Sequence, residues 1–165
     1  MPNTLPVALP PSLRWFILAA LVILADFATK AWVLAAFRPY ESVEVTRFFN
    51  LVLVFNTGAA FSFLADAGGW QKWFFIVLAL GISVWLIIMI RQHAAQRQEA
   101  AAFALVLGGA LGNVIDRVRF GMVVDFLDFH VDGRHWPAFN VADSAISVGV
   151  ALLLWQQLTH KDPPA

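Results

Sequence analysis

The chain has 165 residues, of which 60% are hydrophobic and 13% charged, and its mean hydropathy is +0.72. Soluble domains carry about a quarter charged residues, so this composition indicates that lipid surrounds much of the chain. The formal net charge of zero gives no electrostatic basis for nucleic-acid binding. The absence of cysteine excludes disulfides, thiolate metal sites and Cys nucleophiles.

The first element predicted is a membrane-spanning helix. It follows a Pro-rich start, which predicts a disordered tail over residues 1–12. The apolar stretch from Trp15 to Phe37 is interrupted only by Asp26 and Lys30 and is long enough to span a bilayer. A secretory signal peptide is the alternative interpretation, but its apolar core would be about 7 to 15 residues long, and here apolar sequence resumes after Lys30.

Asp26 and Lys30 are four residues apart and therefore share one face of this helix. Charged side chains inside a span usually face the bundle interior, paired or functional. Two interpretations stay open for them: an internal ion pair, with a lysine able to reach the interface, or groups that orient a site.

The segment from Glu44 to Phe63 is rich in Val and Phe and predicts strands. Both of its alternating faces are apolar, so we expect it to lie against the membrane or the helices. The turn sequence "NTG" at 56–58 follows, and "GGW" at 68–70 breaks the chain before the next helix. We expect an extramembrane β element over about residues 41–66, able to hold an extended peptide by edge pairing.

Two apolar stretches without charge, Trp73–Ile90 and Ala100–Ile115, predict the second and third spanning helices, joined by a polar connector at 91–99. The third ends in "GGALGNVIDR", where Gly108 and Gly112 form a small-xxx-small pattern that allows close approach of another helix.

Asn113, Asp116 and Arg117 follow at spacings of three and four and cluster on one side of the third helix. They form either an Asp–Arg pair at a packed helix end or a polar scaffold for a neighbouring reactive group.

A strand-like stretch containing Asp125 and a turn, "VDGRHWP", lead to the fourth predicted span, Val141–Leu158, with Asp143 near its start. One acid follows the third helix and the other begins the fourth, so both lie at the same membrane face.

Two carboxyl groups in a poorly solvated site share one proton, which equips them for general acid–base catalysis. Asn140 and Asn56 can hydrogen-bond this pair. Taken singly, Asp143 can instead be a helix N-cap and Asp125 a loop residue.

Other catalytic patterns are weaker. Residues 128–135 contain Asp128, His130, Asp132 and His135, but not the HExxH arrangement of a zinc hydrolase, and we expect no metal and no cofactor. "AISVG" at 145–149 approximates the G-x-S-x-G motif but falls inside a predicted helix, which favours a packing hydroxyl for Ser147.

Five motifs follow one another along this chain: Asp26 with Lys30, "NTGAAFS" at 56–62, "GGALGNVIDR" at 108–117, "VVDF" at 123–126 and "FNVADS" at 139–144. In this order they resemble the lipoprotein signal peptidases (signal peptidase II) of bacteria, a family of membrane aspartic peptidases. The resemblance covers about Asp26 to Ser144.

The resemblance implies a membrane all-α fold with a small β element: four transmembrane helices, a periplasmic β-cradle and a short periplasmic helix. Asp125 and Asp143 match the catalytic aspartates. Six further residues match family positions that bind the substrate or support the site: Asn56, Gly108, Asn113, Arg117, Asn140 and Asp26. The substrate would be a prolipoprotein with a diacylglyceryl-modified cysteine, cleaved just before that cysteine, and the enzyme would act as a monomer among membrane lipids.

The resemblance also implies cytoplasmic termini in the bacterial inner membrane and an active site toward the periplasm. The distribution of Lys and Arg does not favour that orientation. The side that holds both termini carries four such residues and the other side six, whereas cytoplasmic loops are normally the richer.

Three functions are compatible with these residues. The first is an aspartic endopeptidase within a single domain over residues 13–160. The second is a proton-coupled transporter or channel that uses Asp26, Lys30, Asp116 and Asp143 as a relay. The third is a membrane assembly factor without enzymatic activity. The concentration of Asp and Asn at one depth favours the peptidase.

Overall fold

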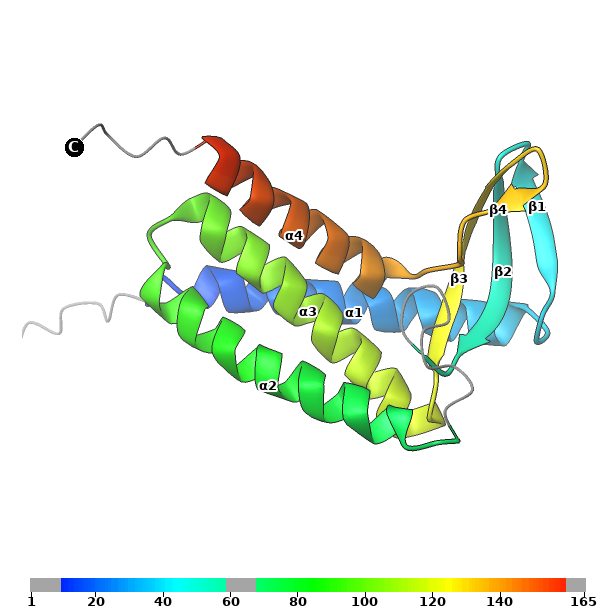
Figure 1. The fold of residues 1–165 in the computed structure, drawn as a ribbon, viewed down its shortest axis with the longest axis horizontal. Helices are drawn as coiled ribbons and strands as arrows, with labels where there is room; N and C mark the ends of the chain where they lie inside the picture. Colours follow the sequence, from blue (N-terminus) through cyan, green and yellow to red (C-terminus); the bar gives the residue numbers. More distant parts are fainter. Residues whose placement is uncertain (1–9, 59–67, 160–165) are drawn as a thin grey trace, which may run out of the picture.

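The computed structural model describes residues 10–58 and 68–159. Its four helices are α1 (Leu13–Ala36), α2 (Gln71–Gln92), α3 (Arg97–Phe120) and α4 (Val141–Thr159). All four are long and apolar enough to cross a bilayer, which confirms the four predicted spans. The ends of α1 and α4 nearest the chain termini lie at the same end of the bundle (Figure 1).

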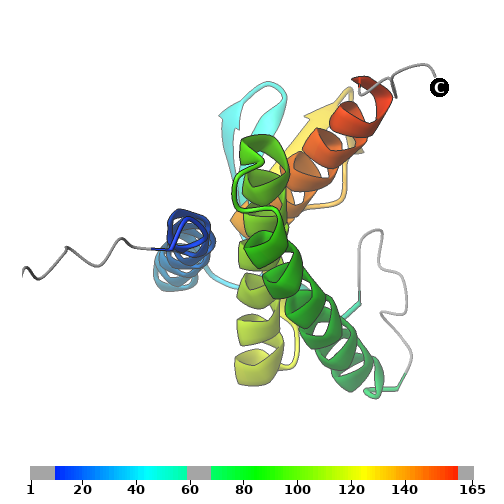
Figure 2. The same cartoon turned by 90° about the vertical axis from the view of Figure 1, so that its left-hand side faces the viewer.

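Three of the helices turn large apolar side chains outward. Trp73 and Val77 of α2 are 64% and 69% exposed, and Leu158 of α4 is 82% exposed. An apolar surface of this extent on helices long enough to span a bilayer fits contact with lipid. α3 differs from them, because it packs against each of the other three helices and contains as many buried residues as those three together. Viewed end-on, α3 lies between α1 and the diverging pair α2 and α4 (Figure 2).

Glycines allow α3 to approach its neighbours closely. A Cβ at Gly108 would lie 2.7 Å from the Ala19 carbonyl oxygen of α1, and one at Gly109 would collide with the Ala142 carbonyl of α4. The predicted role of Gly108 in close helix packing is therefore confirmed, with α1 as its partner. α3 ends at Gly121, whose φ of 79° places it in the left-handed region that commonly terminates helices.

A four-stranded antiparallel sheet caps one end of the bundle, with the strands in the order β1 (Ser42–Thr46), β2 (Phe49–Asn56), β3 (Val123–Val131) and β4 (Arg134–His135). The predicted alternation in β2 is interrupted by a register shift between Leu51 and Val54, where one extra residue opposes β3 next to Asp125. Such bulges bend a strand and redirect its side chains. Before the bulge, every second residue of β2 is buried, namely Asn50 and Val52. Leu53, directly after Val52, is also buried, so the alternation breaks at this point.

An apolar cluster of Val33, Leu53, Val124 and Phe126 fixes the sheet to the end of α1. A second cluster, made by α1, α2 and α3 around Leu86, Ile90 and Phe103, closes the opposite end of the bundle. The sheet therefore lies at the end of the bundle opposite the start of α1 and the end of α4 (Figure 1). This packing places β3 beside the start of α4.

Within the described residues every helix is one of these four long ones, so the additional short helix implied by the resemblance is not found there. Residues 1–9 of the expected tail lie outside the described residues. The division of the chain into a tail and a single domain over 13–160 stays a prediction.

Candidate active site

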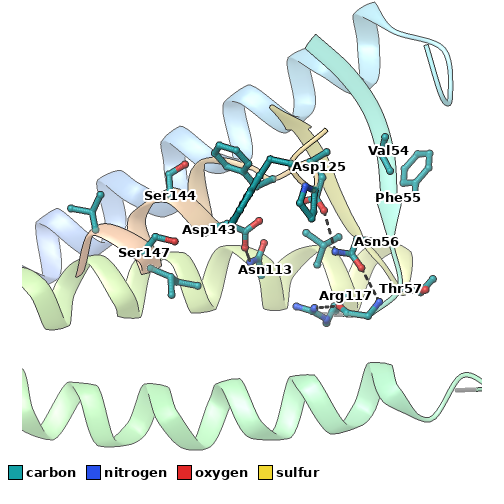
Figure 3. Close-up of a pocket in the computed structure, with 18 residues that line it drawn as sticks. Val54, Phe55, Asn56, Thr57, Asn113, Arg117, Asp125, Asp143, Ser144 and Ser147 are labelled. Atoms are coloured by element: carbon teal, nitrogen blue, oxygen red, sulfur yellow. Dashed lines mark hydrogen bonds between the residues drawn. The ribbon is translucent and has the colours of Figure 1, made fainter. Parts of the chain in front are cut away.

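A pocket of about 700 Å³ opens where the sheet meets the bundle. Its walls come from the end of β2, from α3, β3 and α4, and from the segment Trp136 to Phe139 (Figure 3). Its polar lining consists mainly of Asn56, Asn113, Arg117, Asp125, Asp143 and Ser144. Asn140 lies buried behind this lining, with no exposed surface.

Asp125 lies in β3 and is 2% exposed, so it is a strand residue and the loop interpretation is wrong. Its carboxyl oxygens accept hydrogen bonds from Asn140 Nδ2 at 2.8 Å and Asn56 Nδ2 at 3.2 Å. Burial, and after it the nearby charge of Asp143, raise the pKa of Asp125 to about 7, against the lowering effect of the two amides and of Lys30. Asp125 is therefore able to hold a proton near neutral pH.

Asp143 occupies the third helical position of α4, and Asn140 is the N-cap, so the expectation of an Asp143 N-cap is corrected. The Asp143 N–H donates to Asn140 Oδ1 at 2.8 Å, and the Asn140 N–H donates to Asp143 Oδ2 at 3.3 Å. This is a reciprocal capping box, with Asn and Asp in place of the usual Ser and Glu. It fixes the Asp143 carboxylate at the positive end of the helix dipole.

Asn140 joins the two carboxyl groups. Besides its bonds to Asp125 and Asp143, its Nδ2 lies 3.2 Å from Asn113 Oδ1 and 3.3 Å from the Val124 carbonyl oxygen. Asn113 in turn donates from Nδ2 to Asp143 Oδ1 at 2.7 Å. The strand acid and the helix acid are therefore held in one continuous network of amide hydrogen bonds.

The predicted Asp26–Lys30 pair forms, with an Nζ–Oδ2 distance of 2.7 Å, but Lys30 has two further partners on α3. Its Nζ lies 2.8 Å from Asp116 Oδ2 and donates to Asn113 Oδ1 at 3.1 Å. The proposed Asp116–Arg117 pair is therefore wrong, because Asp116 faces α1 and pairs with Lys30. Asp26 also accepts the Ala142 N–H at 2.9 Å and so helps to cap α4.

Arg117 lines the pocket near Asn56 and Thr57 at the end of β2 (Figure 3). Its guanidinium donates to the Gly58 carbonyl oxygen at 2.7 Å and lies 5.0 Å from the centre of the Phe75 ring. Gly58 belongs to the predicted "NTG" turn, where its N–H donates to Asn56 Oδ1 at 2.9 Å. Arg117 therefore holds the turn that presents Asn56 to Asp125.

Of the residues predicted for the site, the structure brings Asn56, Asn113, Arg117, Asp125 and Asp143 into the pocket lining, with Asn140 directly behind them. Two do not reach the pocket. Asp26 belongs to the ion cluster behind it, and Gly108 lies in the α1–α3 contact.

Sequence reasoning missed one wall of the pocket, formed by Trp136, Pro137, Ala138 and Phe139. Trp136 and Pro137 end the predicted turn "VDGRHWP" and Phe139 begins the "FNVADS" motif, but neither pattern indicates that these side chains line a pocket. The interpretation of Ser147 as a packing hydroxyl is wrong, since Ser147 is exposed and lines the pocket.

The cluster considered for a metal has a different arrangement. Asp128 pairs with His135 at 2.9 Å and accepts a hydrogen bond from Asn50 Nδ2 at 2.9 Å, while the rings of His130 and His135 stack. In residues 10–58 and 68–159, no three His, Cys, Asp or Glu side chains are grouped so that they could hold a metal ion.

The chain matches known proteins over most of its length. The family model described as signal peptidase (SPase) II matches residues 18–159. A lipoprotein signal peptidase of Azoarcus sp. (strain BH72) is 57% identical over 88% of this chain and 83% of its own length. Those of Janthinobacterium sp. (strain Marseille) and Yersinia enterocolitica are 52% and 53% identical over 88% and 87% of this chain, and over 88% and 86% of their own lengths.

Among solved structures, a bacterial membrane enzyme determined by the in meso method at 2.3 Å superposes with a TM-score of 0.80. It is 30% identical, and the match covers 92% of this chain and 94% of that one. These matches show that the chain belongs to the signal peptidase II family.

Proposed function

We propose that this protein is a multi-pass membrane endopeptidase that removes signal peptides from prolipoproteins by an aspartic mechanism. Family membership supports the peptidase activity. The observation that carries the mechanism is that Asp125 and Asp143, from different elements, line one pocket and share Asn140 as a hydrogen-bond partner. Neither the transporter nor the assembly factor accounts for this pairing.

In the proposed reaction, Asp143 is the general base and Asp125 the general acid. Asp143 takes a proton from a water molecule as the water oxygen attacks the scissile carbonyl carbon, and Asp125 donates its proton to the carbonyl oxygen. Asp143 then gives its proton to the leaving nitrogen, the C–N bond breaks, and Asp125 recovers a proton from the tetrahedral intermediate. Asn113 and Asn140 donate hydrogen bonds to Asp143 and hold it in place.

The proposed substrate is a prolipoprotein whose cysteine carries diacylglycerol, cleaved just before that cysteine. The pocket lies at the end of a bundle with a lipid-facing surface, where the scissile bond of a membrane-held substrate would be presented. We propose that the protein is a monomer, since Asp125, Asp143 and their partners all come from one chain. We further propose that it resides in the bacterial inner membrane with cytoplasmic termini, so that the sheet and the pocket face the periplasm.

The substrate class is tested with two forms of one purified precursor, identical except for the diacylglyceryl group on the cysteine. We expect the full-length enzyme in mixed micelles to cleave the modified form before the cysteine and the unmodified form at least about a hundredfold more slowly, because lipid binding orients the scissile bond. Mass spectrometry of the products identifies the bond. Equal rates for the two forms would contradict the proposed specificity.

The proton on Asp125 predicts a pH dependence. Since its pKa is raised to about 7, the acid is protonated below that pH and loses its proton above it. We expect kcat/KM to fall by about tenfold for each pH unit on the alkaline side of pH 7. Circular dichroism at each pH checks that the fold persists, and a kcat/KM that rises from pH 7 to pH 9 would contradict the assignment of Asp125 as the acid.

A further inference from the structure

The pocket continues beyond the two acids along α4. Ser147 lies four residues after Asp143, which places it about 6 Å further along the helix and on the pocket wall (Figure 3). Its neighbours Ile146 and Val148 also line the pocket, so this part of the wall is apolar except for the Ser147 hydroxyl. Ser147 is exposed, and it lies within a helix long and apolar enough to span the membrane.

The other hydroxyl groups in the described helices donate hydrogen bonds to backbone carbonyls of their own helix. Ser83 Oγ donates to the Ala79 carbonyl oxygen at 2.7 Å, and Ser144 Oγ donates to the Asn140 carbonyl oxygen at 2.9 Å. The side chains of Thr29 and Thr159 make the same bond to the carbonyl four residues earlier. This is the ordinary solution for Ser and Thr in an apolar helix. Within the part of the chain that the structure describes, Ser147 Oγ alone among these helical hydroxyls has no hydrogen-bond partner.

The pocket must admit the water that the proposed hydrolysis consumes, so water satisfies the exposed Ser147 hydroxyl before substrate binds. A bound substrate displaces this water, and the hydroxyl then needs an acceptor on the substrate. The substrate of a signal peptidase brings such acceptors, since peptide and ester carbonyls must also be hydrogen-bonded once they leave water.

We propose that Ser147 is a specificity-determining residue whose hydroxyl donates a hydrogen bond to a carbonyl oxygen of the bound substrate, one helical turn from Asp143. The inference rests on the proposed function. The carbonyl comes either from an ester of the diacylglyceryl group or from the peptide backbone of the signal segment, because both lie next to the scissile bond and both enter the membrane.

The test compares Ser147→Ala with wild type on two lipid-modified precursors, one with ester-linked chains and one with ether-linked chains that lack both ester carbonyls. We expect kcat/KM for the ester substrate to fall about five- to tenfold in Ser147→Ala, mainly through KM, because the lost bond holds substrate and transition state alike. Ser147→Thr, which keeps the hydroxyl, is expected to retain activity within about twofold.

The ether substrate separates the two sources. If the acceptor is an ester carbonyl, wild type and Ser147→Ala become equal on the ether substrate. If it is a peptide carbonyl, the same five- to tenfold difference persists. Ser83→Ala, which removes a self-satisfied hydroxyl in α2, serves as the matched control and should leave both constants unchanged.

Equal KM and kcat for wild type and Ser147→Ala on the ester substrate would overturn this inference and leave the proposed function intact. An equal loss in Ser147→Thr would also overturn it, because it would show that the hydroxyl is not what matters. Failure of the wild-type enzyme to cleave either precursor would overturn the proposed function, and this inference with it.

Discussion

Replacing either Asp125 or Asp143 with Asn is expected to lower kcat for cleavage of a lipid-modified precursor by about a thousandfold or more. Asn has nearly the shape of Asp but neither takes a proton from water nor donates one as an acid. Because the two acids act as a unit, we expect the double variant to be no slower than the slower single variant. Single-turnover cleavage in mixed micelles measures these rates.

The matched control is Asp132→Asn. Asp132 is an exposed acid in the β3–β4 turn, outside the pocket, and its φ of 49° is one that Asn adopts readily. This variant should cleave at the wild-type rate. Helix content and resistance to denaturation should be preserved in all four proteins. Near wild-type cleavage by either pocket variant would exclude the aspartic mechanism.

The second large effect is on stability, through Lys30. Replacing Lys30 with Met leaves Asp26 and Asp116 buried without a cation, and these carboxylates are 1% and 4% exposed. Removing one partner of a buried ion pair costs about 3–5 kcal/mol. We therefore expect the free energy of unfolding, measured by denaturant titration in mixed micelles, to fall by about that amount.

Two comparisons identify charge as the cause. Lys72→Met removes a lysine that is only partly buried and lies 5.0 Å from the Trp73 ring, so it should cost less than about 1 kcal/mol. Adding Asp26→Asn and Asp116→Asn to the Lys30 variant should restore most of the stability, since neutral side chains of that shape still accept the Ala142 and Val124 N–H bonds. If the triple variant is no more stable than Lys30→Met, the loss comes from packing.

The Lys30 cluster also connects stability with the site. Lys30 bonds to Asn113 Oδ1, so the amide group of Asn113 points its Nδ2 at Asp143. Asn140 Nδ2 also donates to Asn113 Oδ1 at 3.2 Å, so two donors hold this oxygen away from the carboxylate, which would repel it. The cluster buried behind the pocket therefore orients a group that lies in the pocket lining.

Most of the fold could be predicted from local features of the sequence. Apolar runs, the third and fourth extended by their flanks, predicted all four helices, and the Asp-Gly sequence at 132–133 predicted the turn that joins β3 and β4. Topology then predicted that Asp125 and Asp143 lie at one end of the bundle, since one follows the third helix and the other begins the fourth. These features depend only on neighbouring residues and on the order of the elements.

The partners of each polar group could not be predicted in this way. Spacing within α3 left open an Asp116–Arg117 pair or a polar scaffold, and in the structure Asp116 pairs with Lys30 of α1. Asn140 is both a helix cap and the link between the acids, and this depends on its contacts with Asn113 and Asp125. The Val- and Phe-rich sequence of β2 did not indicate the bulge beside Asp125.

The sequence by itself determined the number of spans, the presence of a β element and the end of the bundle at which the acids lie, because hydrophobic length and turn chemistry are local properties. Only the tertiary structure decided which acid is the more buried, which asparagine joins the two, and which helical hydroxyl is left without a partner. The reason is physical. Hydrogen bonds and burial in this site join residues as far as 83 and 116 positions apart, and the distances between such residues are set by helix packing, which no local spacing records.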